Sequence, residues 1–229
     1  MSPVNLRDLP SPRDITLFRN LTASDVQCIL SSAKVRRFSR NTIITQQTEP
    51  AEYFFLLWRG RARYYFETPA GKKLILRWLV PGQVFGVSGL VEGPSTYLVS
   101  VEAVKDSVAL IWSGATIRGL AQRFPHLLEN ALLIASRYLS WYVAAHAGLA
   151  SQTASERLAH VLAGLAEVAG RKLPGGIELD VTNEELANAA NISLYTASRV
   201  TSNWQLRGIV RRRRGKIVLC SVRRLFSLQ

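Results

Sequence analysis

The sequence predicts an α+β protein. An N-terminal antiparallel β-roll, of the double-stranded β-helix or jelly-roll type, is followed by a long helix and a C-terminal winged helix-turn-helix. Three observations predict this order: strand-like segments fill residues 34–112, a heptad pattern follows Pro125, and two capped helices precede a basic hairpin after Val181. The chain has 229 residues, enough for two domains of ordinary size. We expect a β-roll domain with flanking short helices over 1–124, a dimerisation helix over 125–150 and the winged helix-turn-helix domain over 151–229.

Short strands are expected throughout the first domain. Its segments are rich in β-branched and aromatic residues, and turn signals such as Arg59-Gly60, Ala70-Gly71 and Pro81-Gly82 separate several of them. The expected strands are residues 34–38, 41–45, 53–58, 62–66, 73–80, 96–104 and 107–112. Many short strands in one block are typical of an antiparallel sandwich or barrel.

A long helix is expected to begin at Pro125, because a proline in the first helical turn loses no hydrogen bond. Apolar residues then recur at alternating spacings of four and three, the heptad pattern of a helix that packs against another helix. This dimer seam consists of Leu128, Leu132, Ala135, Leu139, Tyr142, His146 and Leu149. A second stripe, from Leu127 to Ala145, can pack on the strand domain. We therefore predict a homodimer; an ordinary buried helix is the alternative, and Arg137 argues against a membrane span.

Capping boxes mark two helix starts in the last third of the chain. In such a box the side chains of a Thr and of the Glu three residues later each satisfy a free N–H group. One pair, Thr153 and Glu156, opens a helix just after the expected hinge at Ser151-Gln152. The other pair, Thr182 and Glu185, opens a short helix in the most specific segment of the chain.

The segment after the second box is typical of a helix-turn-helix. Asn191-Ile192-Ser193 breaks the short helix, and Ser193 is placed to cap the next one, which ends before Gly208. Two helices joined by a turn of about three residues form this motif. Apolar segments on both sides of the basic turn Arg211–Lys216 form a small wing. In such a module the second helix enters the major groove of duplex DNA.

The distribution of charge favours the same partner. The chain carries 29 Lys and Arg against 16 Asp and Glu, for a net charge of +13. From Leu186 to Gln229 there are nine basic residues and no acid. A basic run is often only a solvated face, but acids normally interleave with it and limit self-repulsion. Their absence favours double-stranded DNA as a partner.

The helical period divides the polar residues of this module into two groups. The residues expected to read bases lie on an exposed face of the second helix and are Tyr195, Ser198 and Arg199. An arginine can fork onto the O6 and N7 atoms of guanine. The residues expected to contact phosphates, which set register without reading sequence, are Thr182, Ser193, Thr196, Asn203, Arg213 and Lys216.

Other classes of function find little support. No histidine precedes His126, so a cupin-like metal enzyme with strand-borne histidines is not expected, and P-loop, HExxH and GxSxG motifs are absent. We expect neither catalytic residues nor a metal site. The start of the chain has no apolar signal segment, which predicts a cytoplasmic protein. Besides a DNA-binding protein and an enzyme, the remaining alternative is a scaffold whose basic tail binds polyanions non-specifically.

With these residues assembled, the sequence resembles the CRP/FNR family of bacterial transcription regulators. The resemblance runs from Leu17 to Leu219 and is most specific in TNEELANAANISLYTASRV. The residues that match the family pattern there are Thr182, Glu185, Ser193 and Arg199. Tyr195-x-x-Ser198-Arg199 is similar to the Glu-x-x-Ser-Arg reading triplet of the FNR branch, with Tyr in place of Glu. The resemblance implies a homodimer on a palindromic DNA site, with RNA polymerase as a partner.

The sensor half departs from the family's cyclic-AMP site. In members that bind cyclic AMP, a glycine-flanked cassette supplies a Glu for the ribose and an Arg-Ser pair for the cyclic phosphate, and the long helix supplies a Thr-Ser pair. The residues at these five positions are Val87, Tyr97, Leu98, Tyr142 and Val143. A buried phosphate without its donors lacks compensation for lost water. We therefore do not expect cyclic AMP as the effector.

The effector is left open by the sequence. An iron–sulfur cluster is not expected, because Cys28 is the only cysteine in the sensor half. Heme needs axial ligands, and the three histidines, His126, His146 and His160, lie on or beside the helices. A less polar effector, a heme or redox response and no effector at all are the alternatives. The candidate pocket residues are Phe85, Gly86, Val87, Tyr97, Leu98, Tyr142 and Val143.

Overall fold

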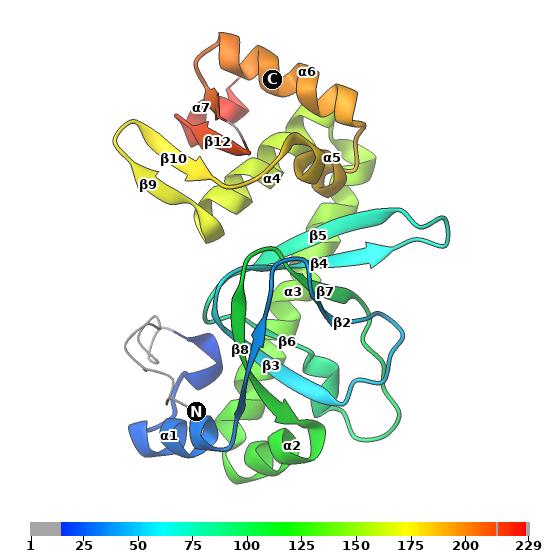
Figure 1. Ribbon diagram of the computed structural model, residues 1–229, viewed down its shortest axis with the longest axis vertical. Coiled ribbons are helices and arrows are strands. Elements are labelled where there is room, and N and C mark those ends of the chain that lie inside the picture. The colour runs from blue at the N-terminus through cyan, green and yellow to red at the C-terminus, as the bar shows by residue number, and fades with distance from the viewer. Residues whose placement is uncertain (1–14, 214, 228–229) are drawn as a thin grey trace. The chain divides into compact units, whose positions relative to one another are not determined.

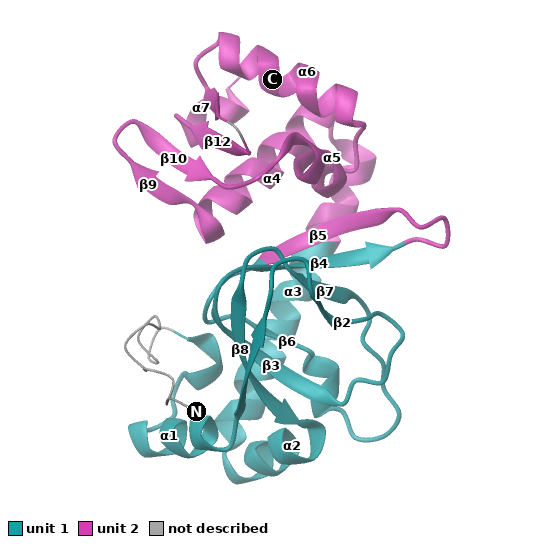
Figure 2. Cartoon of the chain, viewed as in Figure 1, with its two compact units in different colours: residues 1–67, 79–142 teal, residues 68–78, 143–229 magenta. Residues whose placement is uncertain are grey.

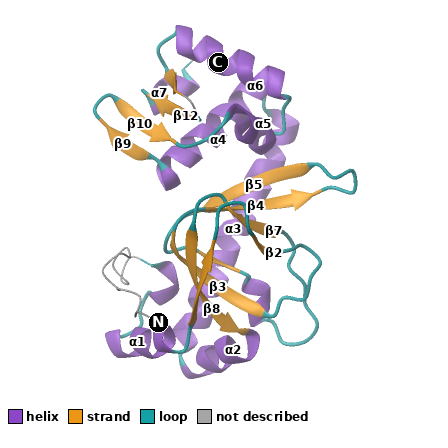
Figure 3. Ribbon diagram, viewed as in Figure 1, coloured by secondary structure: helices purple, strands orange, loops and turns teal. Residues whose placement is uncertain are grey.

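Two antiparallel sheets carry the first half of the chain (Figure 1; Figure 3). The computed structural model describes residues 15–213 and 215–227. One sheet has the strand order β1-β8-β3-β6, and the other has the order β2-β7-β4-β5. The strands are β1 (Lys34–Phe38), β2 (Ile43–Thr45), β3 (Tyr53–Arg59), β4 (Ala62–Glu67), β5 (Lys73–Leu79), β6 (Val84–Phe85), β7 (Ser100–Ala103) and β8 (Ser107–Ser113). This is the jelly-roll that the sequence predicts.

The core of the jelly-roll explains why some strands lack an alternating pattern. β3 lies between β8 and β6, and its five central residues are all buried. Phe54, Leu56 and Trp112 lie in one apolar cluster with Ile29 of α1 (Ala23–Ser31) and Ile117 of α2 (Gly114–Arg123). The indole N–H of Trp112 donates to the carbonyl of Ile29 over 2.9 Å, which satisfies a buried donor.

Strand β7 is shorter than the pattern of residues 96–104 predicts. The segment before it is held by other backbone bonds: the N–H of Tyr97 donates to the carbonyl of Glu49 over 3.0 Å, and the N–H of Thr48 donates to the carbonyl of Tyr97 over 2.9 Å. The short strand β6 is followed by the 3-10 helix η4 (Val87–Leu90), and neither has a periodic pattern long enough to predict.

Helix α3 (Pro125–Ser151) begins at the predicted proline and extends over 27 residues. Leu127, Ala131 and Ile134 of the second stripe are buried in the jelly-roll cluster, as expected for a face that packs on the strands. The amide of Asn130 donates to the carbonyls of Leu17 and Arg19 over 3.0 and 2.7 Å. None of the helices in the described residues is sufficiently long and apolar to cross a bilayer.

The C-terminal elements form a small α+β arrangement around a four-stranded sheet of order β11-β12-β10-β9. Its helices are α4 (Ala154–Ala169), α5 (Asn183–Ala190), α6 (Leu194–Leu206) and α7 (Val222–Phe226). Its strands are β9 (Arg171–Leu173), β10 (Gly176–Leu179), β11 (Val210–Arg213) and β12 (Lys216–Leu219). Leu158, Leu162, Leu186, Trp204 and Ile217 are buried in a common core.

The chain divides into two compact units (Figure 2). The first comprises residues 1–67 and 79–142, and the second comprises residues 68–78 and 143–229. The division therefore falls within α3, after Tyr142. We call the first of these two units the sensor unit.

Candidate nucleic-acid interface

Helices α5 and α6 form the predicted helix-turn-helix, and their ends are capped as the sequence predicts. The N–H of Glu185 donates to Thr182 Oγ1 over 3.1 Å, and the N–H of Thr182 donates to Glu185 Oε2 over 2.9 Å. Asn191 ends α5 in the left-handed conformation, with φ of 49°. Ser193 caps α6 by accepting from the N–H of Thr196 over 3.0 Å. The turn is therefore defined by local polar contacts.

A polar contact that the sequence analysis missed joins the two helices. The side-chain amide of Asn183, the first residue of α5, donates to Ser198 Oγ on α6 over 3.2 Å. Thr201 is fully buried on the same side of α6, and its hydroxyl donates to the carbonyl of Ala197 over 2.9 Å. A polar residue directly after the cap Thr182 is the sequence signal for such a contact.

The outer face of α6 is polar and unoccupied by other parts of the described chain. Tyr195 is 78% exposed. Arg199, one helical turn further along, is exposed and forms no hydrogen bond or ion pair with any described residue. Ser198 lies beside them but is half-buried and already bonded to α5. Of the three residues expected to read bases, Tyr195 and Arg199 therefore present free polar groups.

The residues expected to contact phosphates fall into two sets. Thr182, Ser193 and Thr196 take part in the caps of α5 and α6, where their hydroxyls lie at helix N-termini, the positive ends of the helix dipoles. Asn203 and Arg213 are exposed, on α6 and β11 respectively. N-terminal turns and exposed cations are both suited to phosphate oxygens. The individual contacts stay predictions.

Lys216 is held inside the wing by an acid that the sequence analysis missed. Its Nζ lies 3.0 Å from Glu178 Oε1, and Nη2 of Arg171 lies 2.7 Å from the same oxygen. The Glu178 side chain is 7% exposed. The hydrogen bonds from Arg171 and then from Lys216 lower the pKa of Glu178 below its ordinary value. The contact aligns β9, β10 and β12, so Lys216 serves the wing whether or not it also contacts phosphate.

Two further basic side chains of the wing, those of Arg211 and Arg212, are tied to neighbouring elements. Nη1 of Arg212 donates to Ser202 Oγ of α6 over 3.3 Å, which joins the wing to the second helix. Nη2 of Arg211 donates to the carbonyl of Gly175 over 3.2 Å. Each keeps its positive charge while its position is restricted. The module thus presents an ordered cationic surface beside the outer face of α6.

Two family models match the chain in this order. A cyclic nucleotide-binding domain covers residues 35–124, and a Crp-like helix-turn-helix domain covers residues 156–228. The chain belongs to the CRP/FNR family of transcription regulators. It is therefore a regulator with a helix-turn-helix that binds DNA, and not an enzyme.

Curated relatives in the CRP/FNR family cover most of the chain at low identity. The transcriptional activator protein anr of Pseudomonas aeruginosa is 24% identical over 194 residues, 83% of this chain and 79% of that protein. A CRP-like cAMP-activated global transcriptional regulator of Mycobacterium tuberculosis is 23% identical over 208 residues, 90% of this chain and 92% of that protein. Both are named as transcription regulators.

Solved structures of the family share the fold. FixK2 from Bradyrhizobium japonicum has a TM-score of 0.75 at 24% identity, covering 86% of this chain and 97% of that one. The c-di-GMP responsive regulator CLP of Xanthomonas campestris has a TM-score of 0.77 at 22% identity, covering 87% and 100%. The likeness concerns the fold alone.

From the sequence, Tyr97 is assigned to the position of the family's phosphate arginine, and that assignment stays a prediction. The hydroxyl of Tyr97 donates to the carbonyl of Tyr53 and accepts from its N–H, both over 3.1 Å. Burial of the ring raises the pKa of Tyr97 above its ordinary value, so its hydroxyl stays protonated at neutral pH. The side chain is thus engaged with β3, and its neighbour Leu98 is 78% exposed.

The remaining candidate pocket residues differ widely in how far they are buried. Phe85 is fully buried and stacks on Phe55, with ring centroids 4.6 Å apart. Gly86 adopts a left-handed conformation, and Val87 packs against the jelly-roll cluster. Val143 is 60% exposed, and the ring of Tyr142 lies 5.1 Å from that of Trp141. Their role as an effector pocket stays a prediction.

The predicted dimer seam lies on an exposed face of α3. Leu132 and Leu139 are 60% and 64% exposed, and Leu128 and Leu149 are also exposed. Ala135 and Tyr142 are half-buried, and His146 is exposed. Exposed leucines repeated at heptad spacing form an apolar stripe of the kind that normally marks an interaction surface.

Proposed function

We propose that the protein is a homodimeric regulator that binds a palindromic DNA site, one α6 helix in each half-site. The observation that carries the proposal is the outer face of α6, where Arg199 is exposed and unpaired among the described residues and Tyr195 lies one turn away. Arg199 would read a guanine and Tyr195 a neighbouring base. The exposed leucine stripe of α3 supports the dimer. Acting on the chromosome, such a regulator would work in the cytoplasm, with RNA polymerase as its partner.

The experiment that tests this function is a binding selection on randomised duplexes. We expect an inverted repeat whose half-site centres are about one helical turn apart, roughly 34–36 Å, because a two-fold seam presents two reading helices to one face of the duplex. Affinity should fall steeply with salt, since bound phosphates release counterions. Selected sequences without symmetry, or equal affinity for all duplexes, would count against the proposal; the latter is the outcome expected of a non-specific polyanion binder.

We also propose that the sensor unit does not respond to cyclic AMP. Tyr97 and Leu98 stand where the phosphate contacts belong, and the Tyr97 hydroxyl is already bonded to Tyr53. Val87 stands where the ribose carboxylate belongs, and it packs into the apolar cluster. A charged phosphate placed there would lose water without gaining donors.

Cyclic AMP at millimolar concentration should therefore leave both the melting temperature and the DNA affinity unchanged. Thermal melting and fluorescence anisotropy with the selected duplex are the measurements. A family member that binds cyclic AMP is the positive control in the same buffer. A saturable thermal shift in this protein would contradict the proposal.

A further inference from the structure

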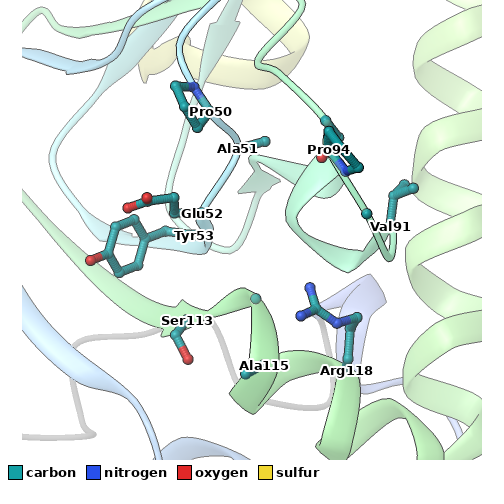
Figure 4. Close-up of a pocket in the computed structure, with 12 residues that line it drawn as sticks. Pro50, Ala51, Glu52, Tyr53, Val91, Pro94, Ser113, Ala115 and Arg118 are labelled. Atoms are coloured by element: carbon teal, nitrogen blue, oxygen red, sulfur yellow. The ribbon is translucent and has the colours of Figure 1, made fainter.

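An open cavity of about 410 Å³ lies within the sensor unit, lined by none of the seven candidate effector residues. Its walls are residues 50–53, 91 and 93–95, together with Ser113 and the first turns of α2 (Figure 4). The volume is in the lower part of the range of small-molecule sites. Pro50, Val91 and Pro94 give the walls an apolar part, and Ser95 and Ser113 add hydroxyls.

Among the described residues that line this cavity, Arg118 is the only cationic one. Its Nη1 donates to the carbonyl of Gly89 over 3.2 Å, and it has no ion pair with any residue in the described part of the chain. Figure 4 shows the guanidinium turned toward the start of α2, on the side of Ser113 and Ala115, while the carboxylate of Glu52 points away from it. One of its N–H groups is used by Gly89. Most of the guanidinium N–H groups are therefore available to a ligand.

The position of Arg118 adds a second source of positive potential. Its side chain folds back over the first turn of its own helix, since a Cβ atom built on Gly114 would lie 2.7 Å from Nη1. The first turn of α2 contains no acid to offset the positive end of the helix dipole. The guanidinium and the dipole therefore attract an anion to the same side of the cavity.

We propose that this cavity binds a small organic anion, a carboxylate or a phosphate monoester with a short apolar body. The planar fork of Arg118 matches two oxygens of either group, which a lysine could not do. The apolar body would lie against Val91 and Pro94. Because Gly89 belongs to η4 and accepts from the same guanidinium, a bound anion would compete for the contact that joins η4 to α2.

Isothermal titration calorimetry of the DNA-free protein tests the site with three probes: butyrate, glycerol phosphate and butyramide. Butyramide has the shape of butyrate without its charge. We expect saturable binding of at least one anion and none of butyramide. Whether butyrate, glycerol phosphate or both bind identifies the acidic group. Since no DNA is present, the result is independent of the proposed DNA-binding function.

Arg118→Gln should weaken anion binding about tenfold or more, the effect of removing a hydrogen bond to a charged group. Arg123→Gln is the matched control, because it removes the same charge from the other end of α2, where Arg123 is exposed and lies outside the cavity. Ala115→Phe fills the cavity from an exposed position without altering Arg118, and it should block binding even if Arg118→Gln folds poorly. Equal affinity of the unaltered protein and both cavity variants, binding of butyramide, or no saturable binding of either anion would overturn the proposal.

Discussion

Changing Leu132 and Leu139 together to Asp should convert the proposed homodimer to monomers. Both leucines are more than half exposed in the single chain, at 60% and 64%, and they lie seven residues apart on one face of α3. Burying each against its twin contributes about 1.5–3 kcal/mol. In the variant, four carboxylates would meet in the same seam, where like charges repel and desolvation is unfavourable. Loss of the apolar contacts and gain of repulsion act in the same direction.

Sedimentation velocity at micromolar concentration is the measurement, with DNA binding as a second readout. A monomer can occupy only one half-site, so the affinity for the full inverted repeat should collapse toward that for a single half-site. The matched control is Ser140→Asp with Ala147→Asp, also exposed and seven residues apart. Ser140 directly follows the seam residue Leu139, and Ala147 directly follows the seam residue His146. Each control position therefore lies about 100° further round the helix than the seam. If the seam variant stays dimeric, the two copies associate through a surface other than the α3 seam.

Arg199→Ala should cost about 1–3 kcal/mol in each half-site and relax the choice of one base pair, because a bidentate contact to guanine carries both affinity and discrimination. The two half-sites of a dimer double the loss on the preferred duplex. Its side chain is exposed and unpaired among the described residues, so the substitution breaks no contact within the protein. The variant should fold and dimerise normally.

Arg213→Ala is the comparison variant, since Arg213 is exposed on the wing strand β11. A phosphate contact carries no sequence information, so all duplexes should weaken alike and the salt slope should fall by roughly one unit per lost contact. Lys216 is less suitable, because removing it also leaves Glu178 with Arg171 alone. The effect of Tyr195→Phe should lie between the effects of Arg199→Ala and Arg213→Ala, with a modest change in base preference. Uniform weakening by Arg199→Ala and altered base choice by Arg213→Ala would reverse the proposed docking of α6.

The sequence predictions were correct where a structure depends on residues close together in the chain, and less accurate where it depends on residues far apart. The capping boxes at Thr153 and Thr182 and the serine cap at Ser193 were predicted correctly, because each depends on residues three positions apart. The helix at Pro125 was also correct, because its apolar stripes repeat over many turns. β7 was predicted too long, since the residues before it have strand-like side chains but pair with residues 48 and 49.

The sequence by itself determined the order of the elements, the helix ends of the helix-turn-helix, the excess of positive charge over its last 44 residues and the family to which the chain belongs. Only the tertiary structure decided which polar residues are free to meet a ligand. Lys216 meets Glu178 across 38 residues, Tyr97 meets Tyr53 across 44, and Arg118 meets Gly89 across 29. Helix caps and heptads depend on residues that are close together in the sequence. The three contacts above depend on how strands and loops far apart in the chain are brought together, and no local pattern specifies that arrangement.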